Sequence, residues 1–241
     1  MTYIQSVKNE LQKHINVEKA NFLPKFFQAF PGGYGEGDQF IGVTVPNKRK
    51  VARKFYKDIP LVEVEELLNE PIHEYRLTAL FILILKYDKF KTDAEKKAIV
   101  NLYLNNIRCI NNWDLVDSSA DKILGPYLLD KEKDLLYELA RSDDLWKQRI
   151  AIITTYYFIR NNQFDHTLNI AKILLNHKHD LIHKAVGWML REVGNRDFDV
   201  EFNFLREHYS QMPRTMLRYA IEKFEEGLRQ QFLKGLVCKS I

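Results

Sequence analysis

DLWKQRIAIITTYY, residues 144–157, combines a short polar lead-in, a basic residue at Arg149 and a run of apolar and small residues. Three further stretches follow the same pattern: PIHEYRLTALFILI (71–84), DLIHKAVGWMLREV (180–193) and PRTMLRYAIEKF (213–224). In each, the apolar residues recur at the spacing of a helix and do not alternate as in a strand. The pattern therefore predicts four similar, largely buried helices.

The four stretches recur at a regular interval. Their aligned basic residues are Arg76, Arg149, Lys184 and Arg218. The first step is 73 positions, which is two units of about 36 with Trp113 at the midpoint, and the other steps are 35 and 34. A period in this range, filled by two helices per unit, is typical of an α-solenoid. An ordinary helical bundle, which also repeats on this scale, is the alternative.

The rest of the chain favours the same all-α class. Nearly every segment after residue 46 has helical periodicity, and five prolines precede or open amphipathic runs: Pro46, Pro60, Pro71, Pro126 and Pro213. The glycine-rich PGGYGEGDQFIGVTV (31–45) predicts a long loop. Since no low-complexity linker divides the chain, we expect a single domain over 1–241, with N-terminal helices in 1–30 and helical repeats over 46–241.

The composition is globular, with 46% of the 241 residues hydrophobic and 28% charged. The formal net charge of +4 permits a polyanionic partner without demanding one. Cys109 and Cys238 form no CxxC pair, so we expect neither a disulfide framework nor a thiolate zinc site. The apolar run LTALFILIL (77–85) is shorter than the roughly 20 residues of a membrane span, and the N-terminus has no signal-peptide apolar region. We expect a cytoplasmic monomer without membrane contact.

Solenoids of helix pairs curve, so equivalent side chains line a concave groove. The aligned basic residues and Trp113 would then form a row along that groove. Cations at helix starts oppose the preference of the helix dipole for anions, which suggests that a bound anion supplies the missing charge. In the alternative, the aliphatic part of each basic side chain packs on the neighbouring repeat and its charged group pairs with an adjacent acid.

INNWDLVDSSADKIL (110–124) predicts the helix at the midpoint of the long step. Its core stripe is Val116, Ser119, Ala120, Ile123 and Leu124. Asn112 is a reasonable N-cap, and Asp114 in the first turn would stabilise the helix dipole. Asp117 lies one turn after Trp113 at the edge of the stripe, where a carboxylate under an indole is a candidate for chemistry. A solvated or ion-paired Asp117 is the alternative.

A second indole, Trp188, follows Lys184 by one turn and precedes Arg191 by three residues. Gly187 beside it removes a side chain, which would let a large partner approach the helix. Core packing of either tryptophan is the alternative.

Four separated motifs in a fixed order carry a resemblance to a known family. They are IGVTVPNKRK, NWDLVD, WKQRIAI and KAVGWMLRE, between about residues 40 and 225. They resemble the bacterial DNA-alkylation-repair glycosylases of the AlkD family. The resemblance implies an α-solenoid of HEAT-like repeats with a concave basic groove that holds duplex DNA. It also implies hydrolysis of the N-glycosidic bond of N3- and N7-alkylated purines, such as 3-methyladenine and 7-methylguanine, with no cofactor and no metal.

The family's functional residues can be carried over one by one. Its catalytic aspartate falls on Asp117, its two groove tryptophans on Trp113 and Trp188, and its phosphate-contacting arginine on Arg149. The basic helix start after IGVTVP falls on Lys48, Arg49 and Arg53, which would contact the DNA backbone. The other groove cations expected to bind DNA are Arg76, Lys184, Arg191 and Arg218. The longer glycine-rich GGYGEGDQF (32–40) leaves the N-terminal DNA contacts open.

The resemblance also implies a mechanism. Alkylation makes the purine a cationic leaving group, so the protein mainly stabilises the oxocarbenium-like charge on the deoxyribose. Asp117 would do this and position a water at C1′, while Trp113 and Trp188 hold the lesion with their ring faces and Arg149 holds a phosphate. The family uses no base-flipping pocket. No lysine in the motifs matches a Schiff-base role, so we expect a monofunctional glycosylase.

Three rival functions remain open at this point. A HEAT-repeat scaffold for another protein would give the four residues no reason to converge, and a catalytically silent relative would bind damaged or branched DNA. His179 and His183 sit at i, i+4 but without an HExxH pattern, which disfavours a metal enzyme. GYGEGD lacks the GK[ST] of a phosphate loop, so nucleotide hydrolysis is unsupported.

Overall fold

The computed structural model describes residues 2–238, which fold almost entirely into helices. No strand occurs in this part of the chain, where the single β-type contact is an isolated parallel bridge between Gln39 and Ile72. The all-α prediction is confirmed, and the paired helices have the arrangement of HEAT-like repeats. No described helix has the length and apolar character that a bilayer crossing requires.

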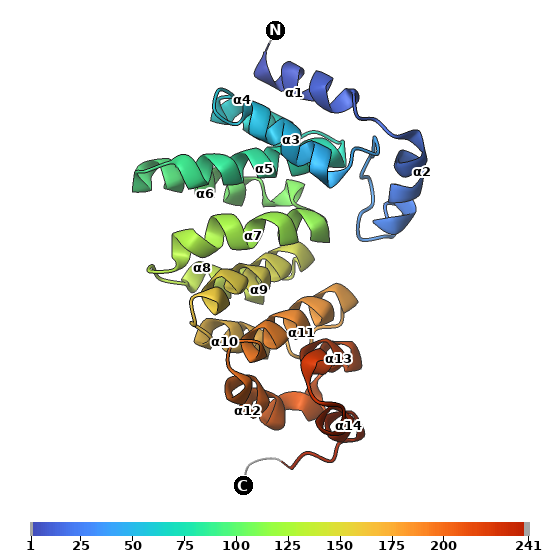
Figure 1. Cartoon of the computed structure of the whole chain (residues 1–241), viewed down its shortest axis with the longest axis vertical. Coiled ribbons are helices and arrows are strands. Elements are labelled where there is room, and N and C mark those ends of the chain that lie inside the picture. The colour runs from blue at the N-terminus through green and yellow to red at the C-terminus, as the bar shows by residue number, and fades with distance from the viewer. Residues whose placement is uncertain (1, 239–241) are drawn as a thin grey trace. The chain divides into compact units, whose positions relative to one another are not determined.

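The chain divides into two compact units, Met1–Ile123 and Leu124–Ile241, with the boundary inside α7 (Trp113–Leu128). The other helices of the first unit are α1 (Tyr3–Gln12), α2 (Val17–Phe26), α3 (Val45–Phe55), α4 (Leu61–Leu68), α5 (His73–Lys89), α6 (Asp93–Asn105) and the 3₁₀ helix η1 (Ile107–Cys109). Those of the second are α8 (Asp134–Arg141), α9 (Leu145–Arg160), α10 (Asp165–Ile173), α11 (Asp180–Gly194), α12 (Phe198–His208), η2 (Tyr209–Gln211), α13 (Arg214–Ala220), η3 (Ile221–Lys223) and α14 (Glu226–Lys234) (Figure 1). The single domain over 1–241 stays a prediction.

In the first unit, α5 is the central helix, and α3 and α4 pack against it. Residues 77–83 of α5 are all buried, so the apolar run LTALFILIL belongs to a core helix as expected. The glycine-rich segment contains no helix before Val45, where α3 begins, and connects α2 to α3. It is held against α2 at Gly42, whose φ is +79° and whose missing Cβ would lie 2.0 Å from the carbonyl oxygen of Asn16. Only glycine fits this position without strain.

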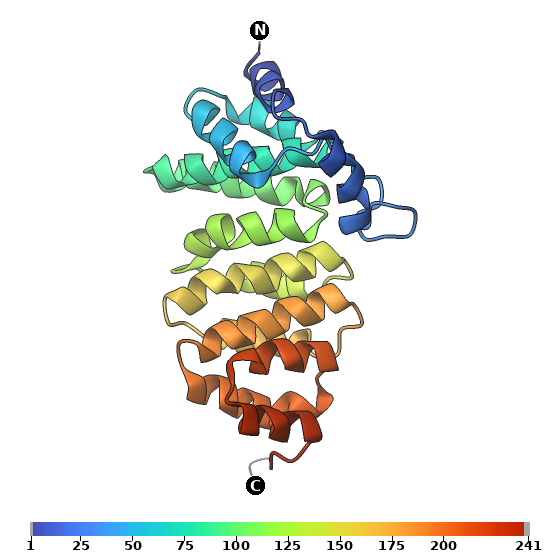
Figure 2. The same ribbon diagram turned by 45° about the vertical axis from the view of Figure 1, so that its right-hand side comes forward.

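The second unit contains a regular two-layer stack. The helices α9, α11 and α13 lie side by side in Figures 1 and 2, and each neighbouring pair is in contact. The helices α8, α10 and α12 pack on them from the other layer. These are the helix pairs that the repeat pattern predicts.

The repeat register is confirmed in the second unit and corrected in α7. Arg149, Lys184 and Arg218 are each the fifth residue of their helix. In α7 the fifth residue is Asp117, and Trp113 is the first, one turn earlier. The midpoint of the 73-residue step located Trp113 wrongly as the equivalent of the cations, because the helices do not all begin at the same offset within the repeat. The acid therefore occupies the position that is basic in α9, α11 and α13.

The proline prediction is confirmed at four positions and wrong at one. Pro46 lies in the first turn of α3, Pro60 and Pro213 are N-cap residues, and Pro71 shortly precedes α5. Pro126 instead lies inside α7, two residues before its end. Its missing N–H removes one hydrogen bond with the preceding turn, which a helix tolerates best near a terminus.

Candidate functional site

The start of α7 has the structure that its sequence predicts. The five residues of the predicted core stripe are all fully buried. Asn112 is buried and precedes the helix directly, and its side-chain oxygen accepts a hydrogen bond of 2.9 Å from the backbone N–H of Trp113. This fixes the point at which the helix begins and hence the face on which Trp113 and Asp117 lie.

Trp113 is held by residues of the N-terminal segment. Its indole Nε1 donates to the hydroxyl of Tyr34 at 3.3 Å, and its ring lies 5.9 Å from Phe26 and 5.3 Å from Phe27, measured between centroids. The indole is half-buried. The glycine-rich loop and the end of α2 thus position a tryptophan that sequence analysis assigned to the site but could not connect to them.

Asp117 lies one helical turn after Trp113 on α7 and is half-buried. Asp117 also influences the buried phenol of Tyr103. Burial raises the pKa of Tyr103, and the negative charges of Asp121 and Asp117 raise it further. Asp121 is itself buried and forms an ion pair with Lys122 at 3.0 Å. Of the two acids, Asp117 is the more accessible.

Asp114 does more than complement the helix dipole. Its Oδ2 lies 3.0 Å from Nε2 of His73, whose Nδ1 lies 2.8 Å from Oδ2 of Asp38. The His73 cluster comprises this histidine with Asp38, Asp114, Arg76 and Asn112, whose amide donates to Asp38 at 3.3 Å. Sequence analysis missed the cluster because its members come from the loop, α5 and the start of α7.

The two carboxylates determine the charge of His73. Burial alone would lower the pKa of His73, but the charge and hydrogen bond of Asp114, together with those of Asp38, outweigh burial and raise it. Burial likewise opposes ionisation of Asp38, yet the hydrogen bond from His73 and the charge of Arg76 lower its pKa. Within this buried cluster, both shifts favour the charged forms of His73 and Asp38.

Arg76 belongs to this network and not to an open surface. It is 5% exposed, and its guanidinium donates to Asp38 at 2.5 Å, to Asn111 at 3.2 Å and to the carbonyls of Glu70 and Pro71. This is the internal pairing that was the alternative to a DNA contact.

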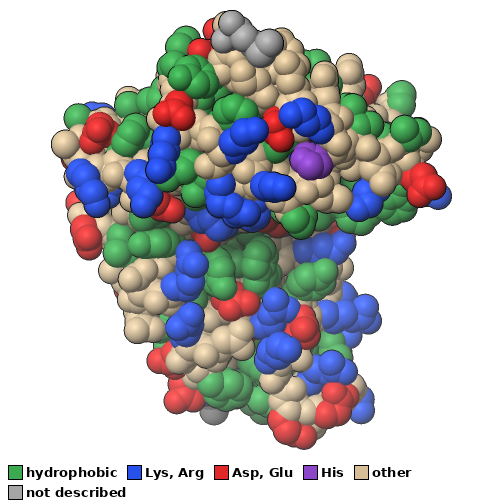
Figure 3. Space-filling view, turned by 45° about the horizontal axis from the view of Figure 1, so that its top comes forward, with side chains coloured by type: hydrophobic (Ala, Val, Ile, Leu, Met, Phe, Trp, Pro, Cys, Tyr) green, Lys and Arg blue, Asp and Glu red, His purple; other side chains and the backbone are tan. Residues whose placement is uncertain are grey.

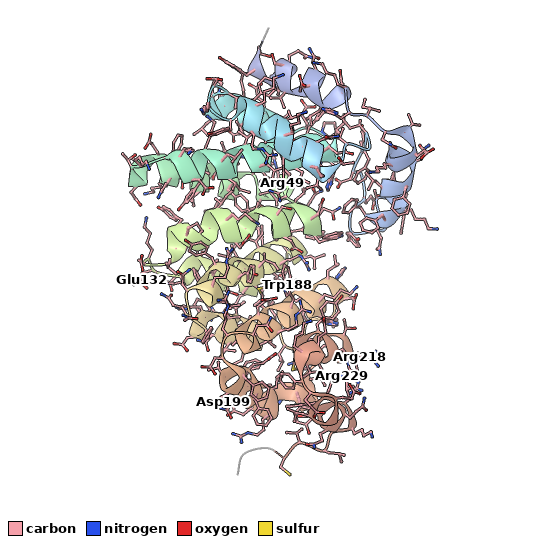
Figure 4. The ribbon with its side chains drawn as sticks, in the orientation of Figure 1. Arg49, Glu132, Trp188, Asp199, Arg218 and Arg229 are labelled. Atoms are coloured by element: carbon pink, nitrogen blue, oxygen red, sulfur yellow. The ribbon has the colours of Figure 1, made fainter. Side chains whose placement is uncertain are left out.

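The predicted backbone-binding residues of α3 differ in their exposure. Lys48 is only 5% exposed, whereas Arg49 and Arg53 are exposed. The guanidinium of Arg49 lies 4.1 Å from the centroid of the Phe81 ring, which orients it on the surface (Figure 4). Figure 3 shows basic side chains gathered on this N-terminal face of the first unit.

In the second unit, Arg149 connects α9 to the start of α11. It is 4% exposed, and its guanidinium donates a hydrogen bond to the carbonyl of Leu181. Leu181 lies two turns before Trp188 on α11. Arg149 therefore supports the helix that carries the second tryptophan, and its contact with a phosphate stays a prediction.

Trp188 is half-buried on α11 (Figure 4). Its Nε1 donates to Glu192 at 3.0 Å, and its ring lies 5.8 Å from that of Tyr156. The neighbouring Gly187 does admit a close approach, but the approaching partner is α13. A Cβ there would lie 2.4 Å from the carbonyl oxygen of Met216 and 2.6 Å from Cβ of Tyr219. The interpretation of Gly187 as an opening for an external partner is wrong.

The remaining predicted DNA contacts of the second unit are more accessible. Lys184 is 40% exposed in its side chain and pairs with Asp180 at 2.7 Å, and Arg218 is exposed. Arg191 forms an ion pair with Glu222, and its side chain is 18% exposed. The three histidines near the start of α11 are hydrogen-bonded to backbone groups, and nowhere in residues 2–238 do three or more His, Cys, Asp or Glu form a group suited to a metal.

Comparison with known proteins identifies a family and a solved structure of similar fold. The family model described as "DNA alkylation repair enzyme" matches residues 7–224. The chain is structurally similar to a predicted DNA alkylation repair enzyme from Enterococcus faecalis, with a TM-score of 0.69 and 16% sequence identity over 88% of this chain and 98% of the other. That similarity concerns the fold alone. No curated protein gives a match.

Proposed function

Since the chain belongs to the family of DNA alkylation repair enzymes, we propose that it is a monofunctional DNA glycosylase. Its substrates would be N3- and N7-alkylated purines in duplex DNA. The observation that carries this proposal is the pairing on α7 of a half-buried Trp113 with the half-buried Asp117 one turn later. In this repeat alone an acid occupies the position that is basic in the repeats of α9, α11 and α13.

Asp117 would stabilise the positive charge that develops on the deoxyribose as the bond to the base breaks. The base departs as a neutral purine because the alkyl group has already made it cationic, so no general acid is required. Asp117 would also orient the water that attacks C1′ and accept its proton. Its partial burial supports this role, since a carboxylate acts more strongly on a nearby cation where water is partly excluded.

Trp113 would face the same sugar. Its contacts with Phe26, Phe27 and Tyr34 fix the ring before substrate binds. The negative face of a rigid indole attracts a cation without the cost of ordering a flexible side chain. Trp188, held by Tyr156 and Glu192, would act in the same way on the sugar–phosphate.

DNA binding would rest on the exposed cations. Arg49, Arg53 and Arg218 are exposed and Lys184, which pairs with Asp180, is partly exposed, whereas Arg76 and Lys48 are buried. Arg149 would contact a flanking phosphate only through the small exposed part of its guanidinium. Its alternative role is to position α11 through the carbonyl of Leu181.

The purified protein should release 3-methyladenine or 7-methylguanine from methylated duplex DNA, measured by chromatography of the freed bases. Strand cleavage should not accompany release, because a monofunctional enzyme leaves the abasic site intact. Tight binding of DNA without release of either base would contradict the proposal. That outcome would favour a catalytically silent relative that recognises damaged or branched DNA.

A further inference from the structure

The first unit contains a cavity of about 420 Å³ beside the His73 cluster. Its walls are mainly apolar and include Phe22 of α2 and Phe27 and Phe40 of the following segment. Charged side chains also line it: Lys48, His73, Glu74 and Asp114 are buried or half-buried, and Lys19 is exposed. A concave, mostly apolar site of about 300–1,000 Å³ with a few polar groups is the usual form of a small-molecule site.

Lys48 is the least explained of these charges. It is 5% exposed, and its ammonium takes part in no hydrogen bond or ion pair in residues 2–238. Burial lowers the pKa of Lys48, although the charges of Asp114 and Glu74 oppose this effect. The ammonium nitrogen is not sealed from solvent, but it is poorly hydrated, so a group inside the cavity that accepts a hydrogen bond would stabilise it.

The charges around Lys48 limit what that acceptor can be. The buried and half-buried groups are Asp38, Glu74 and Asp114, against Lys48, His73 and Arg76, while the remaining lining charge, Lys19, is exposed to water. Glu74 is already bound by the backbone N–H groups of Ile41 and Gly42, at 3.2 and 2.7 Å. Because acids and cations balance, a carboxylate or phosphate would add an uncompensated negative charge. A neutral acceptor, such as a carbonyl or a ring nitrogen, would not.

The walls favour a flat molecule that also carries a donor. Phe27 and Phe40 are parallel at 5.4 Å and 4°, and each stacks on His73 at 5.0 Å. Oδ1 of Asp114 has no hydrogen-bond donor and is closed to solvent. A turn of this carboxylate toward the cavity would let it accept from a ligand. Paired acceptor and donor groups on one edge of an aromatic ring are the chemistry of a nucleobase.

We infer that this cavity binds a planar, neutral nitrogen heterocycle of nucleobase size, with its acceptor on Lys48 and its donor on Asp114. The base could be free, as after excision, or still attached to a strand. Such a site goes beyond the proposed glycosylase, whose family resemblance implies no base pocket. It does not depend on that activity, because binding is measured without reaction.

The test is calorimetric titration of the full chain with adenine, 3-methyladenine and 7-methylguanine. Lys48→Met keeps the length of the stem and removes the ammonium, and Lys50→Met is the matched control on the exposed side of α3. We expect about tenfold weaker binding for Lys48→Met, since a hydrogen bond from a charged group is lost, and unchanged binding for the control. Phe22→Ala, at a wall residue that is 59% exposed, should also weaken binding without disturbing the core.

Two further ligands sharpen the outcome. Benzoate is flat and has an acceptor but no donor, and it should bind more weakly than adenine. A single-stranded oligoadenylate and an abasic strand of equal length distinguish the two sources of the base. Displacement of adenine by the oligoadenylate alone indicates that the site takes a base within DNA. Displacement by neither strand indicates that the site takes the free base. Absence of binding by all three bases, equal binding by Lys48→Met, or benzoate binding as tight as that of adenine would each overturn the inference.

Discussion

His73 shows how three distant residues produce one charged centre. Asp38 and Asp114 lie on either side of the imidazole, and Arg76 balances the second carboxylate charge. A histidine whose pKa is higher in the folded protein than in the unfolded chain stabilises the fold. Its contribution is complete below the unfolded pKa of 6.5. This contribution is lost as the pH rises through the folded pKa, which lies above 6.5.

His73→Gln should therefore change the pH dependence of stability in one window. The free energy of unfolding of the wild type, measured with urea at several pH values, should fall above pH 6.5 relative to that of the variant. Below that pH the difference between the two proteins should be constant until Asp38 titrates. A difference that stays constant through the alkaline range would mean that His73 is neutral in the folded protein.

For individual residues, the sequence predicted only the burial that follows from helical periodicity. The buried stripe of α7 and the accessible edge with Trp113 and Asp117 follow from helical spacing. The burial of Lys48, Arg76 and Arg149 does not follow, because spacing gives the face of a helix and not the partner that covers it. Arg76 is covered by a loop and by two backbone carbonyls that accept hydrogen bonds from it, and Arg149 by the start of another helix. None of these contacts leaves a local signal in the sequence.

In the second unit, α11 packs closely on α13. Gly187 allows the backbone of α13 to come so near that a methyl group would overlap with Met216 and Tyr219. The repeat pattern predicted both helices and their succession correctly. It could not predict that they touch at this glycine, because the interhelical distance depends on the side chains of both partners.

Gly187→Ala should destabilise the second unit by about 1–3 kcal/mol, the usual cost of overpacking a core. The measurement is the free energy of unfolding in urea. Gly227→Ala is the matched control, since the nearest atom to its Cβ is the flexible carboxylate of Glu225 at 2.9 Å. There we expect a smaller change, because alanine favours the helix while the capping carboxylate of Glu225 has only to shift slightly. Equal effects of the two changes would contradict the close contact.

Glu201 of α12 is a buried acid in the second unit. It is 2% exposed, its Oε1 has no hydrogen-bond donor, and burial raises its pKa to about 9 despite the charge of Arg191. The folded protein must therefore hold a proton that the unfolded chain releases above pH 4.5. Folding is opposed increasingly as the pH rises from 4.5 towards 9.

Glu201→Gln removes this proton uptake and should stabilise the protein at pH 7 by about 3 kcal/mol. At pH 4.5 wild type and variant should be nearly equal. Thermal unfolding at both pH values measures the difference. A variant less stable than the wild type at pH 7 would indicate that Glu201 is ionised and paired.

For the whole protein, sequence and structure agree on an all-helical chain of repeats, and the family match covers residues 7–224. DNA binding by such a chain should depend strongly on salt, because each phosphate contact releases counterions. Arg53→Gln should weaken binding to any sequence and reduce the slope of log K against log salt by about 1. Lys97→Gln, an equal change of charge at an exposed residue of α6, should leave the slope unchanged. Fluorescence anisotropy over a salt series measures both slopes, and equal slopes would exclude Arg53 from the interface.

The most direct measurement is the rate of 7-methylguanine release from a methylated duplex by Asp117→Asn, at protein concentrations that saturate the DNA. Asparagine keeps the shape of the side chain and removes its charge. Loss of one electrostatic contact to a transition state typically costs about 100-fold to 1,000-fold in rate. We predict a decrease of that size with DNA affinity retained, and no decrease for Asp130→Asn at the exposed residue after α7. Release by Asp117→Asn at the wild-type rate would contradict the proposed role of this acid.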